Sequence, residues 1–199
     1  MSSGMYNTNC ISSGFIFLVS EAWFLGVWYE IARFSHPAPT PRPGVPHLTL
    51  RPMLTACVRL TFSLKDNGQL RVERSGLDAN GKLQVQVGEA AQGHAEHARL
   101  FFKYPGEYEE DLGVVEADYE DHALLYGCHL TSTGHVSQNS WILARDQTLD
   151  EDTTQILKAV LSSRHVDISQ FTFTRQDDKC QQQNPDNATI ITLPGDIGV

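Results

Sequence analysis

Long hydrophobic runs are absent from this chain of 199 residues. No stretch approaches the roughly 18 consecutive apolar residues that a membrane-spanning helix needs. Basic residues are also scarce, because 15 Lys and Arg stand against 24 Asp and Glu, for a formal net charge of -9. Nucleic acids and anionic membrane surfaces bind to clustered positive charge. The sequence therefore predicts no membrane span and no nucleic acid among the partners.

Cysteines are few and far apart, and the chain lacks several motifs of catalytic and metal sites. There is no Cys-x-x-Cys pair, which disfavours a local zinc site. Gly-x-Ser-x-Gly, His-Glu-x-x-His and P-loop motifs are missing too. We therefore expect no metal, no cofactor and no enzymatic activity. Two long-range disulfides in an oxidising compartment suit the cysteines better, with three possible pairings among Cys10, Cys57, Cys128 and Cys180.

The two ends of the chain carry contrasting signals about secretion. Residues 1–14 contain no Lys or Arg, so they lack the basic start of a secretory signal. Residues 1–23 are predicted to be an irregular segment whose signal peptide is missing or atypical. The sequon at Asn187 predicts a glycosylation site and favours a secreted, extracellular protein. Residues 181–199 are predicted to be a flexible tail.

Alternating apolar and polar residues recur along the middle of the chain. Residues 58–64 (VRLTFSL) alternate in this way and run into Asp66-Asn67-Gly68, a tight hairpin turn. The alternation resumes at residues 70–72 and again at 83–87, after a second turn at Asp78-Ala79-Asn80-Gly81. This succession predicts an antiparallel all-β domain, either a sandwich or an up-and-down barrel. Further strands are predicted at residues 99–103, 112–118, 123–129, 137–144 and 171–174.

Two segments depart from the strand pattern. A helix is predicted over residues 149–163, where Asp150 can cap the N-terminus and an apolar stripe can pack on the sheet. The stripe consists of Ile156, Leu157, Val160 and Leu161. Residues 35–56 hold six of the nine prolines and predict an irregular loop, since proline cannot donate to a strand ladder.

Three short motifs, in order and separated by about the length of a barrel, resemble the signature of the lipocalin family. The sequence has Gly26-Val27-Trp28 at its first strand, Ala117-Asp118-Tyr119 before a later one, and Arg145 after Trp141-Ile142-Leu143-Ala144. The resemblance implies an eight-stranded antiparallel up-and-down β-barrel over residues 24–180, with one C-terminal α-helix packed outside. It also implies that Arg145 packs over the Trp28 indole at the closed end. The structural motif residues are then Gly26, Trp28, Asp118, Tyr119 and Arg145.

Within the family, the apolipoprotein D-like and bilin-binding lipocalins are the most similar group. The stretches that carry this resemblance are residues 28–31, 65–68, 118–126, 141–145 and 178–180. The resemblance implies the disulfides Cys10–Cys128 and Cys57–Cys180. It further implies a carrier, a monomer or weak oligomer, that binds a small hydrophobic ligand such as a steroid, fatty acid, retinoid or bilin.

The pairing of Cys57 also predicts which side chains face the ligand. If Cys57 points outward to reach Cys180, alternation turns the apolar residues of that strand into the barrel. Two later strands add apolar walls, and the resemblance places a tryptophan in the pocket. The predicted ligand-binding residues are Val58, Leu60, Phe62, Leu64, Val72, Val85 and Trp141.

Two other functions remain open from sequence, and one segment bears on ligand choice. The proline-rich residues 35–56 could bind or inhibit another protein. An enzyme of the prostaglandin D synthase kind would need a free cysteine thiolate, whereas every cysteine here has a plausible disulfide partner. Residues 104–111 are expected at the open end, and their acidic side chains predict a preference for neutral ligands over carboxylates.

Overall fold

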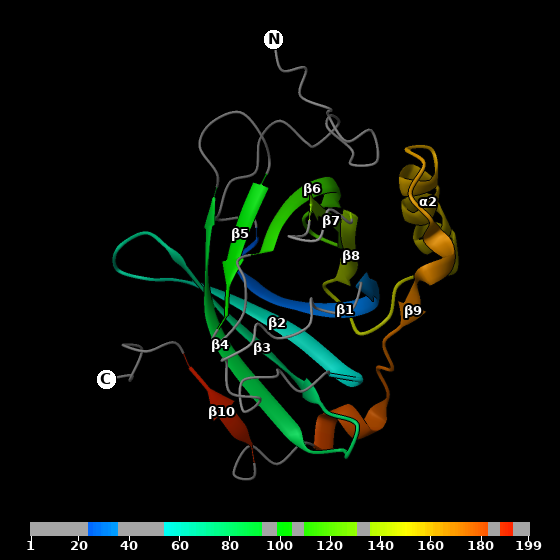
Figure 1. The fold of residues 1–199 in the computed structure, drawn as a ribbon. Coiled ribbons are helices and arrows are strands. Elements are labelled where there is room, and N and C mark those ends of the chain that lie inside the picture. The colour runs from blue at the N-terminus through cyan, green and yellow to red at the C-terminus, as the bar shows by residue number, and fades with distance from the viewer. Residues whose placement is uncertain are drawn as a thin grey trace, which may run out of the picture.

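The computed structural model describes residues 24–35, 54–92, 99–104, 110–130, 136–182 and 188–192. Eight long strands within these ranges enclose a common interior (Figure 1). They are β1 (Gly26–Ser35), β2 (Ala56–Leu64), β3 (Leu70–Leu77), β4 (Leu83–Gln92), β5 (Arg99–Lys103), β6 (Glu110–Asp118), β7 (His122–Leu130) and β8 (Val136–Ala144).

Each strand pairs antiparallel with the next, and β8 returns to pair with β1. Closure leaves few free edges, which is how a barrel protects its backbone donors and acceptors. This confirms the predicted eight-stranded antiparallel up-and-down barrel. Among the described residues, no helix is long and apolar enough to cross a membrane.

Both predicted hairpin turns form for the expected reasons. Gly68 has φ +82° and donates its N–H to the Lys65 carbonyl at 2.9 Å. Gly81 has φ +75° in the next turn, where the Asp78 carboxylate accepts the backbone N–H groups of Asn80 and Lys82. A positive φ carries no steric cost for glycine, so these turns fix the strand register on either side.

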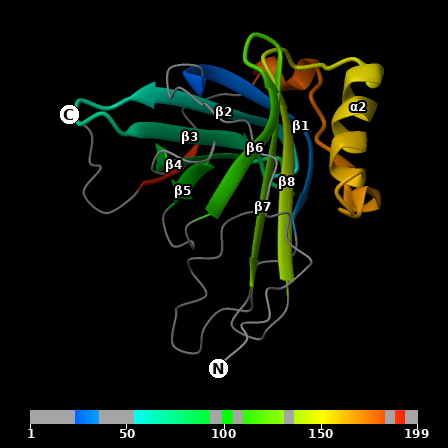
Figure 2. The ribbon, with the colours of Figure 1, turned by 90° about the horizontal axis from the view of Figure 1, so that it is seen from above.

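The helix α2 (Glu151–Ser162) lies outside the barrel beside β1 and β8, as Figures 1 and 2 show. Its N-cap is Asp150, whose carboxylate accepts the Thr153 N–H at 2.7 Å. The helix is shorter than the predicted 149–163, because Asp150 and Ser163 are its caps. Leu157 and Leu161 are buried against the outer faces of β1, β6, β7 and β8.

The predicted apolar stripe on α2 is wrong at one position. Ile156 is 62% exposed, whereas Val160 is partly buried. The buried line runs through Thr154, Leu157 and Leu161, at spacings of three and four residues. Ile156 precedes Leu157 by one residue and so lies about 100° away around the helix, on the solvent side.

The C-terminal part of the chain adds four short elements to the barrel wall. They are η2 (Ile168–Gln170), β9 (Thr172–Phe173), η3 (Asp178–Gln182) and β10 (Thr189–Ile191). β9 pairs with β1, and β10 pairs in parallel with residues 84–86 of β4. β10 corrects the prediction that residues 181–199 are only a flexible tail. The half of β4 nearest residue 83 has no partner in β5, and the β-branched residues of β10 occupy that edge.

Candidate functional site

One end of the barrel is closed by the residues of the three short motifs. The guanidinium carbon of Arg145 lies 3.7 Å from the centre of the buried Trp28 ring. Arg145 also donates to the carbonyls of Leu25 and Val27 at 3.0 Å each and of Tyr119 at 3.1 Å. Burial lowers the pKa of Arg145, which nevertheless stays charged as arginines do in proteins. A cation on an aromatic face, held by three backbone carbonyls, makes a rigid floor.

The other motif residues fix the backbone around this floor. Gly26 has φ +92°, and a Cβ there would lie 3.4 Å from Arg145 Nη1. Asp118 accepts the N–H of Glu120 at 3.1 Å and so stabilises the β6–β7 turn. The Tyr119 ring packs edge-on against Phe24, and burial raises the pKa of its hydroxyl. All five motif residues therefore meet at this closed end.

Above the floor, the interior is apolar. Aromatic rings succeed one another across it, with centroids 5.8 Å apart for Phe24 and Phe62 and 6.1 Å apart for Phe62 and Phe102. The buried interior cluster takes side chains from every strand of the barrel. Its members are Phe24, Trp28, Leu60, Phe62, Leu70, Val72, Ala90, Leu100, Phe102, Tyr104, Leu112, Val114, Ala123, Leu125, Trp141 and Leu143.

Most of the residues predicted to bind ligand are buried, and four of them belong to this cluster. Those four are Leu60, Phe62, Val72 and Trp141. Val58 is also fully buried, near the start of β2. Leu64 departs from the expectation, because it is 58% exposed. It is the last residue of β2, where the β2–β3 hairpin projects beyond the barrel (Figure 1).

Val85 departs from the expectation for a different reason. It pairs with Ser75 on β3 and with Ile190 on β10, and it is only half-buried. Direct partners across a ladder share a face, and Val72 pairs with Gly88, which places the even-numbered residues of β4 inside. Gln84 and Gln86 are accordingly buried while Val85 faces outward. The prediction was one residue out of phase, which reverses every side chain.

A polar network borders the apolar cluster, and sequence reasoning missed it. The Glu30 carboxylate is fully buried and forms ion pairs with Arg33 Nη1 at 3.1 Å and Arg74 Nη2 at 3.2 Å. Thr174 Oγ1 donates to Glu30 Oε1 at 2.6 Å, and Arg33 donates to the Leu54 carbonyl. Burial lowers the pKa of Arg33, an effect that Glu30 opposes and Arg74 reinforces.

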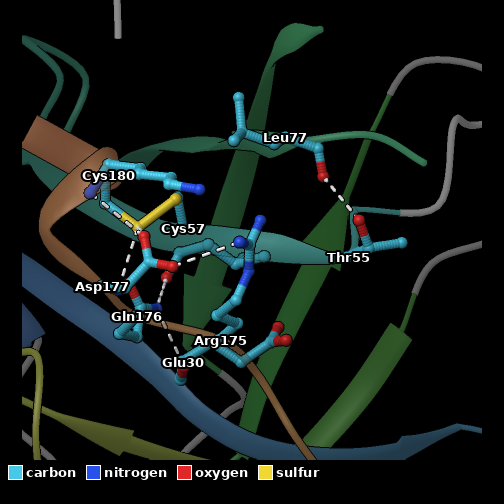
Figure 3. Close-up of a disulfide and its surroundings, with 10 residues drawn as sticks. Glu30, Thr55, Cys57, Leu77, Arg175, Gln176, Asp177 and Cys180 are labelled. Atoms are coloured by element: carbon cyan, nitrogen blue, oxygen red, sulfur yellow. Dashed lines mark hydrogen bonds and ion pairs between the residues drawn. A yellow bond between two sulfur atoms is a disulfide. The ribbon is translucent and has the colours of Figure 1, made fainter. Parts of the chain in front are cut away.

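The network sits where the barrel wall changes partners. Pairing between β1 and β2 ends at Tyr29 with Arg59, and the C-terminal segment 172–180 lies beyond that point. Gln176 Nε2 donates to the carbonyls of Glu30 at 3.0 Å and Val58 at 2.8 Å (Figure 3). The segment thus joins two strands that no longer bond to each other.

The Cys57–Cys180 disulfide holds this segment against β2, as the resemblance implied (Figure 3). It links positions 123 residues apart, and loops of that length stabilise a fold by about 4 kcal/mol. Cys128 is also disulfide-bonded, while its predicted partner Cys10 lies outside the described residues, as does Asn187. Cys57, Cys180 and Asp177 are the only described group close enough to hold a metal, and the disulfide occupies both sulfurs.

Comparison with known proteins agrees with this architecture. The model of the lipocalin / cytosolic fatty-acid binding protein family matches residues 25–178. Apolipoprotein D of Macaca fascicularis is 30% identical over 159 residues, covering 77% of this chain and 75% of that protein. The crustacyanin-A1 subunit of Homarus gammarus is 25% identical over 157 residues, covering 79% of each.

Solved structures show the same fold at lower identity. Lobster apocrustacyanin A1 superposes with a TM-score of 0.67 at 24% identity, covering 81% of this chain and 83% of that one. Insecticyanin of Manduca sexta gives a TM-score of 0.68 at 18% identity and covers 96% of both chains. These comparisons confirm the resemblance drawn from the short motifs.

Proposed function

Because this chain belongs to the lipocalin / cytosolic fatty-acid binding protein family, we propose that it is an extracellular carrier of one small hydrophobic molecule held inside the barrel. The observation that carries the proposal is the interior itself. Every strand contributes apolar side chains to one buried cluster, and the Trp28–Arg145 pair closes one end of it. A steroid, fatty acid, retinoid or bilin matches an interior of this kind in size and chemistry.

The energetics favour such a ligand. Apolar surface removed from water contributes about 25 cal/mol per Å². A ligand that lies against Leu60, Phe62, Val72 and Trp141 would bury most of its surface on apolar atoms. The rigid floor below would need no rearrangement, so little of this free energy would be lost to ordering the protein.

The state of the cysteines supports both a carrier and an extracellular setting. Cys57, Cys128 and Cys180 are disulfide-bonded, so the described residues contain no thiolate of the kind that a lipocalin enzyme would use. Disulfides persist mainly in oxidising compartments. The alternative role in binding another protein rests on the proline-rich residues 35–56, of which 36–53 lie outside the described residues, and it stays a prediction.

Tryptophan fluorescence tests the proposal directly. Trp141 lies in the interior cluster, so a ligand bound there should quench its emission. Titration with progesterone, arachidonate, retinol and biliverdin should give saturable quenching at one ligand per protein for at least one of them. The response should shrink in Trp141→Phe and persist in Leu64→Ala, whose side chain is exposed. A folded barrel that responds to none of these ligands would contradict the proposal.

A further inference from the structure

The interior network of Glu30, Arg33 and Arg74 assigns a chemical class to the ligand. We propose that Arg33 and Arg74 bind the carboxylate of an acidic, amphipathic ligand whose apolar part lies in the interior cluster. This inference rests on the proposed carrier function and narrows it from any hydrophobic molecule to an acidic one.

The network adjoins the apolar cluster on two sides. Arg33 is the direct cross-strand partner of Trp141 between β1 and β8. Arg74 is the direct partner of Leu60 between β2 and β3, and it follows Val72 by two residues on the same face of β3. Direct partners have Cβ atoms about 5 Å apart. One molecule a few carbon atoms long can therefore touch the cluster and the network together.

The charges in the network favour an anion. Two guanidinium groups surround one carboxylate, which gives these three side chains a formal charge of +1. The guanidiniums carry ten N–H donors together, whereas a carboxylate accepts about four hydrogen bonds. A second carboxylate would complement both the charge and the planar donor pattern of arginine. Buried cations are costly without such compensation.

Glu30 serves in this scheme as the group that positions the two arginines. It is fully buried, and Thr174 Oγ1 holds one of its oxygens from the C-terminal segment. The carboxylate thereby fixes both guanidiniums before any ligand enters. Preorganised donors lose less free energy on binding than donors that must first be ordered.

This preference is opposite to the one that the acidic residues 104–111 predict. Those residues were expected at the mouth of the barrel, and 105–109 lie outside the described residues. Arg33 and Arg74 are buried among the interior strands, where charges are weakly screened. A charge in direct contact with the ligand outweighs charges at an exposed rim.

A purely structural role for the network makes a different prediction. The three residues could serve only to join β1, β3 and the C-terminal segment where β1 and β2 separate. Loss of Arg74 would then lower stability and weaken all ligands equally. An anion site instead predicts a selective loss for acidic ligands.

Retinoic acid and retinol provide the test, because they share a hydrocarbon skeleton and differ at the head group. Their dissociation constants would be measured at neutral pH by tryptophan quenching for wild type and Arg74→Gln. Wild type should prefer retinoic acid by about tenfold or more, the value of a charge-assisted hydrogen bond. Arg74→Gln should abolish this preference and leave retinol binding within about twofold. Arg71→Gln is the matched control, since Arg71 lies on the same strand, faces outward and pairs with Glu73.

Two further variants keep the test decisive. Glu30→Gln removes the competing carboxylate and should raise the preference for retinoic acid further. If Arg74→Gln does not fold, the double variant Glu30→Gln/Arg74→Gln avoids an unbalanced buried charge and should show less preference than Glu30→Gln alone.

The outcomes separate this inference from the carrier proposal. Equal affinity for both retinoids in folded wild type and in Arg74→Gln would overturn the acidic ligand and leave the carrier intact. A folded wild type that binds neither retinoid, nor any of the four ligands named above, would overturn both.

Discussion

Arg145 lies over the face of Trp28 at 3.7 Å while its N–H groups donate to three backbone carbonyls from two separate segments. One side chain therefore ties the start of β1 to the β6–β7 turn across more than a hundred residues of sequence. This relationship leads to the first prediction.

Arg145→Ala should destabilise the barrel by about 3 kcal/mol. The change removes a cation–π contact and leaves buried carbonyls without a donor. Urea unfolding followed by circular dichroism measures the loss. Arg145→Lys should recover only part of it, because an ammonium lacks the fork of donors. Arg71→Ala, at a partly exposed ion pair, should change stability by less than about 0.5 kcal/mol. Similar losses for Arg145→Ala and Arg71→Ala would contradict the assigned role.

Leu60→Ala and Leu64→Ala form a matched pair on β2. Leu60 is buried in the interior cluster, whereas Leu64 is exposed. Leu60→Ala should cost about 3 kcal/mol of unfolding free energy, and Leu64→Ala less than about 0.5 kcal/mol. If Leu60 also lies against the ligand, its variant should bind ligand several-fold more weakly at a temperature where it remains folded. Equal costs for the two variants would mean that β2 is turned over.

Asp150 should make stability sensitive to acid. Its hydrogen bonds with Thr153 lower its pKa below the ordinary value of 3.8. The stability that it contributes is therefore complete above the unfolded pKa and is lost as pH falls through the folded pKa. Asp150→Asn keeps an N-cap acceptor but cannot titrate. The variant should lose less thermal stability than wild type between about pH 4 and pH 2, which differential scanning calorimetry can measure. Identical pH profiles would rule out this contribution.

Replacing both Cys57 and Cys180 by serine should lower unfolding free energy by about 4 kcal/mol. The change should also loosen the C-terminal segment, since Gln176 and Thr174 would then hold it by hydrogen bonds alone. Hydrogen exchange should accelerate at the Cys57-position and Thr174 amides, which donate to Arg175 and Ile31. The Tyr126 amide on the β7 side of the barrel is the internal control. Uniform acceleration at all three amides would indicate global rather than local opening.

Regular patterns and short motifs predicted most of the fold. Residues 99–103 were predicted as a strand and form β5 with those bounds. The motif residues predicted the closed end, because the Gly26 backbone and the Arg145 donors are local requirements of that geometry. Alternation on β2 correctly placed Leu60 and Phe62 inside.

The departures arise where tertiary contacts decide. Val85 is apolar but faces outward, because the turn at Asp78–Gly81 pairs Leu77 with Leu83 and so sets the phase of β4. Counting back from that turn would have revealed it. Charged residues in strands ordinarily indicate a solvated face, so Glu30, Arg33 and Arg74 gave no sign of burial except their positions in phase with Trp28 and Val72. β10 depends on a vacant edge of β4 that no local pattern announces.

The pairing of Thr174 with Glu30 spans 144 positions of the sequence. The first strand of the chain must therefore wait for almost the last before one of its edges is satisfied, and its other late partner is β8. Contacts so distant along the chain pay their loop-closure entropy before they return any stability. Folding should accordingly be slow, on the order of milliseconds to seconds, and the barrel cannot close during synthesis until the segment around residue 174 has left the ribosome.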